Sequence, residues 1–316
     1  MRVVVTGATS FIGAATVVRL LRAGHQVYAV VRPASGHLNN LLDRIPETAA
    51  ERLQVIELDL SDIGMLRNHA AVRAEERAAD AWIHIGWDGA GSENRKNRSV
   101  QQGNVRHSLA AVRAAAELGC RRFLFTGSQA EYGIRHDLTA EDAPCRPVSE
   151  YGKAKADFGR QAAPLCERLG MEYVHARIFS VYGPGDHPWS LVQSCLRTWI
   201  SGGEMEFGAC SQKWNFLYIE DAALALACLL TEGGAGVYNI ASNDTRPLRE
   251  YIGELYELCG CRGGCRYGMR PENAEGPTDL MPDIQKILAE TGWRPTTTFS
   301  EGIYETLHCL QEQAAG

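Results

Sequence analysis

Near its start the chain reads Val3-Val4-Val5-Thr6-Gly7-Ala8-Thr9-Ser10-Phe11-Ile12-Gly13. The three valines form a short apolar run that is typical of a buried strand, and the helix-length segment Gly13–Ala23 follows the turn. Gly7 permits a tight turn directly after the strand, and Gly13 permits a helix to pack closely against that strand. The stretch therefore predicts a strand–turn–helix unit at the start of an α/β fold.

The same unit is the context that a dinucleotide-binding site requires. Backbone amides at the start of a helix point at a phosphate, and the helix dipole favours the negative charge. The middle glycine of the usual motif is replaced by Ser10, a small residue whose hydroxyl can itself bond a phosphate. We expect the cofactor to contact Gly7, Thr9, Ser10, Phe11, Ile12 and Gly13.

Apolar runs and helix-length segments alternate along the first half of the chain. The expected strands are Val3–Thr6, Val27–Val31, Leu53–Leu58, Ala81–Ile85, Phe123–Thr126 and Tyr173–Ile178. The expected helices are Gly13–Ala23, Asp62–Ala78, Val105–Leu118 and Tyr151–Leu169. Short continuous strands separated by helices predict βα crossovers, and hence a Rossmann-type, doubly wound parallel sheet covered on both faces.

The alternation becomes irregular after Arg177. The later expected elements are a turn at Tyr182–Asp186, helices at Leu191–Ile200 and Asp221–Leu230, and strands at Phe216–Ile219 and Gly236–Ala241. We expect residues 1–177, with returning segments at about 214–241, to form the cofactor-binding domain. Residues 178–213 and 242–316 are expected to form a smaller C-terminal α/β lobe that binds substrate.

The composition is that of an ordinary globular protein. Of 316 residues, 45% are hydrophobic and 22% are charged, and 32 Lys and Arg against 38 Asp and Glu give a net charge of −6. This balance does not predict the basic face that binds nucleic acid. No apolar run reaches the ~18 residues of a membrane span. We therefore expect neither nucleic acid nor a membrane as a partner.

The cysteines do not indicate a disulfide framework. The ten of them are about 3% of the chain, below the ~8–10% of a disulfide scaffold. Because Arg2–Val5 resembles a strand rather than a signal peptide, we expect a cytoplasmic protein with reduced thiols. Cys259, Cys261 and Cys265 lack a Cys-x-x-Cys pair and a nearby fourth ligand, so no metal site is expected. The role of this cluster stays open.

Residues after the second and third strands bear on the identity of the cofactor. Nineteen residues after Gly13 stands Arg32, where an NAD enzyme commonly carries an acid that binds the ribose 2′-hydroxyl. A guanidinium pairs with a 2′-phosphate, so NADP(H) is favoured, and an arginine stacked on the adenine of NAD(H) stays an alternative. Asp59 and Leu60 are expected at the adenine edge.

Candidate catalytic residues lie in the middle of the chain. Tyr151 and Lys155 are four residues apart at the start of an expected helix, so they share one face. An ammonium beside a phenol favours the phenolate and lowers the tyrosine pKa from about 10. Ser128 follows a strand at the carboxyl edge of the sheet, where its hydroxyl is placed to hold a substrate oxygen near Tyr151.

Together these features resemble the extended short-chain dehydrogenase/reductases, which include nucleotide-sugar epimerases, dehydratases and 4-ketoreductases. The resemblance covers essentially the whole chain and rests on Thr6–Gly13, Asn104, Ser128, Tyr151, Lys155, Tyr182–Pro184, Gly292–Pro295 and Glu301–Ile303. It implies that Ser128, Tyr151 and Lys155 are catalytic and that Lys155 also holds the nicotinamide ribose. It further implies a homodimer formed through the helices Val105–Leu118 and Tyr151–Leu169.

The resemblance also assigns residues around the cofactor. Asn104 is expected as a structural asparagine near the site. His84-Ile85-Gly86-Trp87 takes the place of the family's His-Leu-Ala-Ala beside the cofactor. Gly86 and Ile178 are accordingly expected to contact the cofactor.

Departures from the family pattern bear on the reaction and the substrate. Ser128-Gln129-Ala130 stands where dehydratases carry Thr-Asp-Glu, so the acid/base pair for water elimination is absent there. Trp214-Asn215-Phe216 replaces Arg-Asp-Phe, whose arginine contacts the nucleotide diphosphate, and Ser180 replaces an asparagine. Lys213 is one candidate to compensate for that arginine, while Trp214 is expected either to stack on a ring of the ligand or to join the core. Arg270 matches another phosphate-contacting arginine.

The expected substrate-binding residues are therefore Trp87, Gln129, Ser180, Lys213, Trp214 and Arg270. Glu131 lies in the segment Gln129–Tyr132 that flanks the predicted pocket, and it is expected either to be a solvent-exposed loop carboxylate or to help select the substrate. We expect an NADP(H)-dependent reductase of a sugar carbonyl, acting on a small-molecule substrate such as a nucleotide-linked 4-keto-6-deoxyhexose. Two alternatives stay open: a 4-epimerase with tightly bound NAD, and a non-catalytic dinucleotide-binding regulatory protein.

Overall fold

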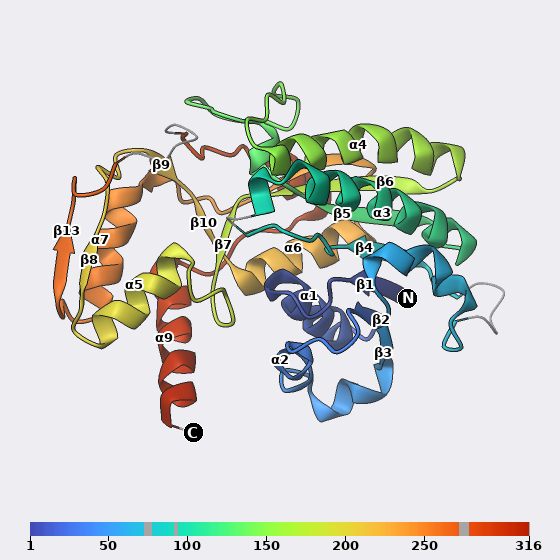
Figure 1. The fold of residues 1–316 in the computed structure, drawn as a ribbon, viewed down its shortest axis with the longest axis horizontal. Helices are drawn as coiled ribbons and strands as arrows, with labels where there is room; N and C mark the ends of the chain where they lie inside the picture. The colour runs from blue at the N-terminus through green and yellow to red at the C-terminus, as the bar shows by residue number, and fades with distance from the viewer. Residues whose placement is uncertain (73–77, 92–93, 272–277, 316) are drawn as a thin grey trace.

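Seven parallel strands form one sheet in a computed structural model that describes residues 1–72, 78–91, 94–271 and 278–315. Their order is β11-β6-β5-β4-β1-β2-β3 (Figure 1). The strands are β1 (Arg2–Thr6), β2 (Gln26–Val31), β3 (Leu53–Glu57), β4 (Ala81–His84), β5 (Arg122–Ser128), β6 (Glu172–Ile178) and β11 (Gly236–Ile240). The predicted Rossmann-type, doubly wound parallel sheet is confirmed.

Helices cover both faces of this sheet. One face packs against α1 (Phe11–Arg22) and α6 (Ile219–Thr231), and the other against α3 (Arg98–Glu117) and α4 (Glu150–Arg168). Successive side chains of a strand point to opposite faces. Val3 and Val5 therefore pack with α1 and α6, whereas Val4 joins the cluster beneath α3 and α4. Burial on both faces explains why β1 is continuously apolar.

Serine caps set the starts of the two helices that border the site. Ser10 Oγ accepts a hydrogen bond from the amide of Gly13 at 3.1 Å, and Ser149 Oγ accepts one from the amide of Gly152 at 3.1 Å. Such caps satisfy amides that lack an acceptor within the helix. As a result α4 begins just before Tyr151, which lies in its first turn.

The helix predicted at Asp62–Ala78 is wrong in type and length. A 3-10 helix, η2, spans Leu60–Asn68, and His69 after it is extended, with ψ of 139°. Residues 73–77 of the prediction lie outside the described residues. Within η2 only Ile63 and Leu66 are buried, so it lacks the apolar stripe that tertiary packing needs to stabilise an α-helix.

The later segments form short elements beside the sheet (Figure 1). Three small sheets pair β7 (Ser180–Tyr182) with β10 (Phe216–Tyr218), β9 (Lys213–Trp214) with β12 (Arg246–Pro247), and β8 (Glu204–Glu206) with β13 (Gly264–Arg266). The other helices are α2 (Leu38–Leu42), α5 (Leu191–Ile200), α7 (Leu248–Leu258), α8 (Gln285–Thr291), α9 (Phe299–Ala315), η1 (Glu47–Arg52), η3 (Asn94–Lys96) and η4 (Gln129–Glu131). The strand predicted at Gly236–Ala241 returns to the large sheet as β11. The division into a cofactor-binding domain and a substrate lobe stays a prediction.

The outer surfaces of α3 and α4 are mainly polar. Their exposed side chains include Arg98, Arg106, Arg113 and Glu117 of α3, and Lys153, Arg160 and Arg168 of α4. Most apolar residues of both helices are buried within the chain, in the cluster that covers this face of the sheet. The apolar residues of these two helices are therefore largely used inside one chain, and the homodimer that the resemblance implies stays a prediction.

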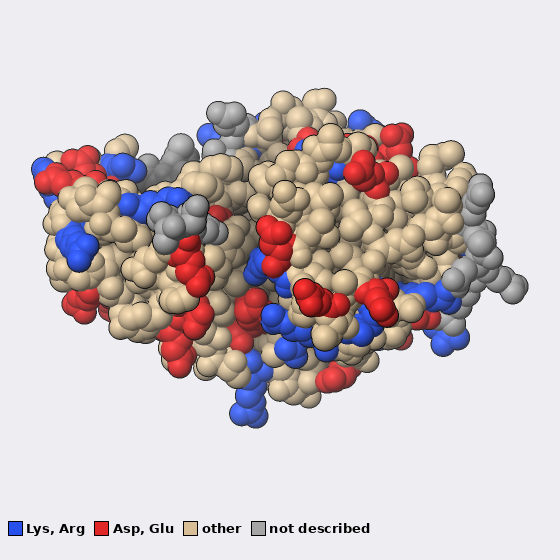
Figure 2. All heavy atoms as spheres, turned by 90° about the horizontal axis from the view of Figure 1, so that it is seen from below, with Lys and Arg blue, Asp and Glu red and all other residues tan. Residues whose placement is uncertain are grey.

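The following observations bear on the predictions about membrane, nucleic-acid and metal binding. In the part of the chain that the structure describes, no helix is long and apolar enough to cross a membrane. On the face shown in Figure 2, basic and acidic side chains are interspersed. Over the described residues, no three His, Cys, Asp or Glu side chains are grouped to hold a metal ion. Cys259, Cys261 and Cys265 are free thiols.

Candidate active site

The turn between β1 and α1 lies against the segment that follows β4. Gly7 has φ of +71°, and a Cβ atom at this position would lie 2.6 Å from the amide nitrogen of Gly86. A Cβ atom at Gly13 would lie 2.1 Å from the carbonyl oxygen of Gly7. The backbone leaves no room for side chains here, so the glycines allow the turn, the helix start and the β4 segment to meet.

This turn fits the phosphates of a dinucleotide. The amide of Ser10 donates to the carbonyl of Gly7 at 3.0 Å, and the amide of Gly13 donates to Ser10 Oγ at 3.1 Å. The amides of Phe11 and Ile12 belong to the first turn of α1, where no helical carbonyl can accept from them. They are left for an anion, whose charge the helix dipole also favours.

Arg32 lies at the end of β2 with its side chain exposed. Its carbonyl accepts from the amide of Ser35 at 3.2 Å, and Ser35 Oγ lies 3.5 Å from Thr9 Oγ1 of the glycine turn. Asp59 accepts from the amide of Ser61 at 2.9 Å, and this bond, helped by the charge of Arg32, lowers its pKa. The structure thus brings Arg32, Asp59 and Thr9 to one region.

Ser128, Tyr151 and Lys155 come together at the carboxyl edge of the sheet. Tyr151 and Lys155 are buried on α4, with 8% and 3% of their surfaces exposed, and Ser128 is the last residue of β5. The hydroxyl of Ser128 is close enough to that of Tyr151 to lower the pKa of the tyrosine. Lys155 Nζ lies 5.7 Å from the centre of the Tyr151 ring. The arrangement therefore places a hydroxyl, a phenol and an ammonium around one point.

The ammonium of Lys155 is surrounded by aromatic rings and a backbone carbonyl instead of water. Its Nζ lies 4.1 Å from the centre of a Trp87 ring and 4.5 Å from that of Phe125, and it donates to the carbonyl of Thr126 at 2.7 Å. Burial lowers the pKa of Lys155 to about 7, although the carboxylate of Glu131 opposes this shift. This lysine is therefore near its titration point at neutral pH.

No sequence motif pointed to Arg95, which lies over Tyr151, the tyrosine predicted to be catalytic. Its guanidinium carbon is 4.3 Å from the centre of the Tyr151 ring. Burial raises the pKa of Tyr151, whereas Arg95 and the hydrogen bond with Ser128 lower it. A tyrosine pKa lowered by Lys155 was expected, but that ammonium lies against Trp87 instead. Arg95 belongs to no recognisable motif, so only its position in space reveals it.

Two side chains hold the segment after β4 beside the site. Asn104 Oδ1 accepts from the amide of Asp88 at 2.9 Å, and Asn104 Nδ2 donates to the carbonyl of Asp88 at 2.7 Å. Trp87 donates from its indole nitrogen to Gln101 Oε1 at 2.8 Å, and its ring lies edge-on to Tyr151 with centres 6.4 Å apart. Trp87, predicted to bind substrate, thus packs directly against Tyr151 and Lys155.

His84 connects three elements beneath the site. Its ring nitrogens lie 2.7 Å from Thr6 Oγ1 and 2.9 Å from Ser108 Oγ. Complete burial, together with the charge of Lys155, lowers the pKa of His84 to about 3, so the ring is neutral. The neutral ring joins β1, β4 and α3. Gly86, two residues further along, lies against the glycine turn instead.

Glu131 is not the solvent-exposed carboxylate that was expected. Its side chain has no exposed surface, because the capping box of η4 turns it inward. Oε1 accepts from the amide of Ser128 at 2.8 Å and from His175 Nε2 at 3.0 Å, and Oε2 accepts from Arg177 Nε at 3.0 Å. A buried carboxylate requires such partners. One signal in the sequence could have indicated this burial. His175 and Arg177 are two residues apart in an expected strand, so both side chains lie on one face of β6 and need a partner there.

The other predicted substrate contacts are dispersed. Gln129 follows Ser128 in η4, and Ser180 begins β7 directly after β6. Lys213 and Arg270 are exposed, and Ile178 pairs with Ser128 across β5 and β6. The roles of these residues toward a substrate stay predictions.

Trp214 and its neighbour lie at a junction with the C-terminal part. The indole N–H of Trp214 is buried and has no hydrogen-bond partner among the described residues, and its ring packs against the core, which is one of the two expected outcomes. Asn215 donates from Nδ2 to the carbonyls of Ser242 and Asp244, each at 2.9 Å, and accepts from the amide of Ser242 at 2.9 Å. The amide of Asn215 therefore fixes the backbone next to Trp214.

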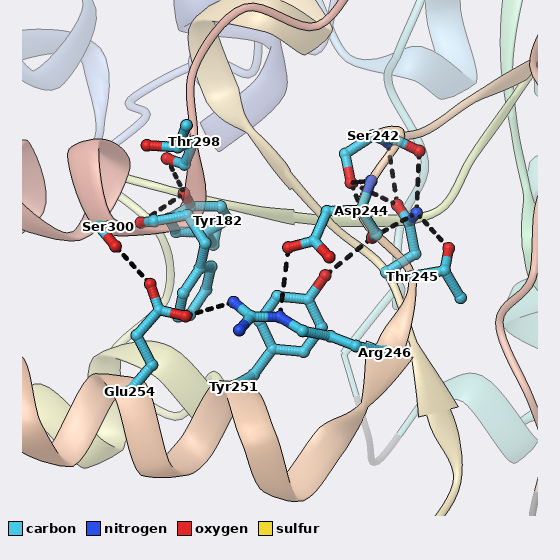
Figure 3. Close-up of polar contacts among 11 residues, drawn as sticks. Tyr182, Ser242, Asp244, Thr245, Arg246, Tyr251, Glu254, Thr298 and Ser300 are labelled. Atoms are coloured by element: carbon cyan, nitrogen blue, oxygen red, sulfur yellow. Dashed lines mark hydrogen bonds and ion pairs between the residues drawn. The ribbon is translucent and has the colours of Figure 1, made fainter.

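An ion pair network continues from this junction, as Figure 3 shows. Arg246, on the strand paired with β9, bonds to Glu254 and lies 3.2 Å from Asp244 Oδ2. Two carboxylates balance its charge within the chain, so Arg246 is a poor candidate for binding phosphate. Lys213 and Arg270, by contrast, are exposed.

The chain is similar to known proteins in both sequence and fold. A family model described as the NAD dependent epimerase/dehydratase family matches residues 3–241. A UDP-glucose 4-epimerase from Thermotoga maritima, solved with UDP-glucose, has a TM-score of 0.87 at 21% identity, covering 99% of this chain and 100% of that chain. A dTDP-glucose 4,6-dehydratase from Streptomyces venezuelae, solved with NAD, has a TM-score of 0.84 at 25% identity, covering 100% and 98%.

A third relative has a different reaction in its name. The dTDP-4-dehydro-6-deoxyglucose reductase of Escherichia coli is 24% identical over 214 residues, which are 66% of this chain and 67% of the relative. The family model spans the sheet, the glycine turn and the Ser–Tyr–Lys set described above. The chain therefore belongs to the NAD-dependent epimerase/dehydratase family of oxidoreductase-type enzymes, within the extended short-chain dehydrogenase/reductases.

Proposed function

We propose that this enzyme reduces a carbonyl group on a nucleotide-linked sugar, a 4-keto-6-deoxyhexose, with a nicotinamide dinucleotide as the hydride source. The observation that carries the proposal is the meeting of Ser128, Tyr151 and Lys155 at the sheet edge, where the one carboxylate of the segment Ser128–Glu131 is already bonded inside the chain. The family acts on nucleotide sugars by epimerisation, dehydration or reduction, so the reaction must be argued from these side chains.

Each member of the set has a distinct part in carbonyl reduction. When bound in the glycine turn, the cofactor supplies the hydride. The Tyr151 hydroxyl donates its proton to the carbonyl oxygen as that oxygen becomes an alkoxide. The Ser128 hydroxyl, which accepts from the amide of Ala130 at 3.2 Å, keeps its own hydrogen free to donate to the same oxygen. The guanidinium of Arg95, 4.3 Å from the centre of the Tyr151 ring, stabilises the phenolate that remains, and Lys155 would hold the nicotinamide ribose, as in the family.

Dehydration is a poor fit to the residues around Ser128. Eliminating water requires an acid and a base beside the sugar. The amide of Gln129 does not exchange a proton at neutral pH, and Ala130 has no polar side-chain atom. The carboxylate of Glu131 is buried, and both of its oxygens accept hydrogen bonds from inside the chain. No carboxylate of this segment is therefore available to a substrate.

The protonation of Tyr151 favours reduction over epimerisation as the first step. Burial raises the pKa of Tyr151 in the absence of cofactor, so the resting side chain carries its proton and is ready to act as an acid. A 4-epimerase first needs a base that removes a proton from a hydroxyl group. A 4-epimerase with tightly bound NAD is the second candidate, because the same three residues can perform both half-reactions.

For the cofactor we propose NADP(H) in preference to NAD(H). Family members bind NAD, as the Streptomyces venezuelae dehydratase structure records. In this chain, however, the exposed guanidinium of Arg32 lies at the end of β2, near Asp59 and the glycine turn. A 2′-phosphate offers this guanidinium a bidentate partner that a ribose hydroxyl does not.

The proposal is tested by incubating the purified enzyme with NADPH and a panel of nucleotide-linked 4-keto-6-deoxyhexoses. We expect NADPH consumption matched by a deoxysugar product in NMR spectra, and Tyr151→Phe to lose about 100-fold or more in kcat. An enzyme purified with bound NAD that interconverts nucleotide hexoses without net NADPH use would establish the epimerase instead. Full turnover by Tyr151→Phe would refute the role of the tyrosine, and absence of any turnover would revive the regulatory alternative.

A further inference from the structure

The backbone amide of the catalytic serine, Ser128, donates a hydrogen bond to a buried carboxylate. Ser128 and Glu131 form a reciprocal capping box around η4, in which Ser128 Oγ accepts from the amide of Ala130 and Glu131 Oε1 accepts from the amide of Ser128 at 2.8 Å. This pair of bonds sets both the backbone and the side-chain rotamer of Ser128. The position of the serine hydroxyl thus depends on where the Glu131 carboxylate lies.

His175 holds that carboxylate from the floor of the sheet. An ionised carboxylate only accepts hydrogen bonds, so His175 Nε2, 3.0 Å away, donates to it, while His175 Nδ1 lies 3.2 Å from the Tyr173 hydroxyl. Helix α4 packs on the same ring, because a Cβ atom at Gly159 would lie 2.6 Å from His175 Cε1. The helix that carries Tyr151 and the carboxylate behind Ser128 therefore share one support.

Arg177 holds the second oxygen of the carboxylate. Its Nε donates to Glu131 Oε2 at 3.0 Å, while Nη1 donates to the carbonyl of Glu141 at 3.0 Å and Nη2 to Cys145 Sγ at 3.1 Å. Its guanidinium carbon also lies 4.4 Å from the centre of the Tyr132 ring. With four contacts the guanidinium has little freedom to rotate, so the carboxylate is clamped.

Stability alone does not account for this cluster. Burial raises the pKa of Glu131, but the charges of His175 and Arg177 and the amide of Ser128 outweigh it, so the carboxyl is ionised. Removing such charges from water is costly, and apolar residues of the same shape commonly give equal or greater stability. The distinctive contribution of the ion cluster is the fixed direction of its hydrogen bonds.

We propose that Glu131, clamped by His175 and Arg177, is a positioning residue that fixes the Ser128 hydroxyl relative to Tyr151. The inference rests on the proposed catalytic role of Ser128. It assigns to Glu131 no contact with substrate. Misplacing a reacting group by about 1 Å can lower turnover about 100-fold, so the effect of losing the clamp is measurable.

A cavity next to the cluster offers a route for chemical rescue. It has a volume of about 870 Å³ and is lined by Glu131, His175 and Arg177, with Gly159 of α4. Truncating Glu131 to alanine would leave a space that opens toward this cavity. Formate is a small carboxylate that fits the vacated position and pairs with the same donors.

The experiment compares three variants with the wild-type enzyme. Glu131→Ala removes the acceptor of the Ser128 amide, and Glu131→Gln keeps one oxygen but loses the charge. Glu172→Gln is the matched control, because Glu172 pairs with Arg122 at the opposite end of the same two strands, with 2.9 Å from Arg122 Nε to Glu172 Oε2. The kcat and KM of the folded fraction are measured with and without formate.

We expect kcat of Glu131→Ala to fall about 100-fold while KM stays within about two-fold, with a fall of about 10-fold for Glu131→Gln. Formate should restore part of the kcat of Glu131→Ala and change neither the wild type nor Glu172→Gln. A kcat per folded molecule equal to wild type in both Glu131 variants would overturn the inference. A rise in KM with unchanged kcat would also overturn the inference.

Hydrogen exchange at the Ser128 amide separates this inference from the proposed reaction. In the wild type and in Glu172→Gln, the amide is protected by its bond to Glu131. In Glu131→Ala we expect it to exchange at least about 10-fold faster, and formate to slow it again. Unchanged protection would overturn the inference whichever substrate the enzyme uses. If the wild type fails to reduce the sugars, the proposed function fails and this readout still decides the role of Glu131.

Discussion

The guanidinium carbon of Arg95 lies 4.3 Å from the centre of the Tyr151 ring, closer than the ammonium of Lys155 at 5.7 Å. Arginine is charged at every accessible pH, whereas Lys155 has a pKa of about 7. The acid strength of Tyr151 therefore depends on a cation outside the Tyr-x-x-x-Lys pair.

Replacing Arg95 is expected to change how activity depends on pH. Tyr151 must carry a proton to act as an acid, so activity falls as pH rises through its pKa. Arg95→Ala removes a charge that lowers this pKa, while Ser128, Lys155 and Glu131 stay in place. The alkaline limb of kcat/KM should move to higher pH, with kcat at neutral pH about 10-fold lower because the acid is weaker.

The conservative variant Arg95→Lys serves as the control for this prediction. It keeps the positive charge but loses the planar group that stacks on the ring. We therefore expect the alkaline limb of its kcat/KM profile to lie between those of the wild type and Arg95→Ala. The pH profiles of the three enzymes, measured side by side, provide the check. Coincident alkaline limbs would show that Arg95 does not act on Tyr151.

Lys155 is expected to make stability depend on pH in the absence of cofactor. Its pKa is lowered to about 7 by burial, against about 10.4 in an unfolded chain. Between these values the unfolded state binds more protons, so wild-type stability rises with pH relative to Lys155→Met, by at most about 1.4 kcal/mol per pH unit. Below pH 7 both states are protonated and the difference should be constant. Urea unfolding from pH 6 to 9 tests this slope, and a flat difference across that range would contradict it.

Arg32 is expected to decide which dinucleotide binds more tightly. Losing a charge-assisted hydrogen bond costs about 1.5–3 kcal/mol, so Arg32→Ala should weaken NADP⁺ binding by about 10-fold or more. NAD⁺ binding should change far less, because it has no 2′-phosphate. Titration calorimetry of both dinucleotides measures the ratio, with Arg32→Lys as the variant that keeps the charge. A wild-type preference for NAD⁺ would reject the assignment.

Gly7 and Gly24 form a matched pair for testing the glycine turn. Both have positive φ, +71° and +82°, so alanine costs about 1–2 kcal/mol of backbone strain at either position. Only at Gly7 would the new Cβ meet backbone, the amide of Gly86 at 2.6 Å, since nothing lies within 4 Å at Gly24. Gly7→Ala should therefore lose about 1–3 kcal/mol more stability. Equal losses in urea unfolding would argue against the contact.

The sheet was predictable because its signals are local. The Val3–Val5 run is apolar since both faces of β1 are covered, and the roles of Gly7 and Gly13 follow from adjacent elements. The helix at Asp62–Ala78 failed for the opposite reason. Helix length depends on an apolar stripe that packs elsewhere, and η2 buries only Ile63 and Leu66.

The site was predictable only where a motif names its residues. Tyr151 and Lys155 are one helical turn apart, so their common face follows from the sequence. Glu131 was misplaced because its partners, His175 and Arg177, are 44 and 46 residues away. Such pairings arise from the order of strands in the sheet, which a single sequence does not show. The same holds for Arg95, which reaches Tyr151 from a different segment.

The substrate side resisted prediction most. Lys213 and Trp214 form a two-residue strand whose partner is Arg246–Pro247, and Arg270 stands just before residues outside the described part of the chain. Short strands carry little periodicity, so their pairing is not encoded in a readable pattern. Local patterns therefore describe poorly the segments that carry the predicted substrate-binding residues.

The approach of Gly7 to Gly86 has a practical meaning for loop grafting. Because the two backbones touch, the β1–α1 turn and the segment after β4 form one module, together with Leu60, whose side chain would meet a Cβ atom at Gly86 at 2.9 Å. A chimera that imports either loop alone from a relative with another cofactor preference would force neighbouring strands apart. Exchange of cofactor specificity by transplantation therefore calls for all three pieces at once.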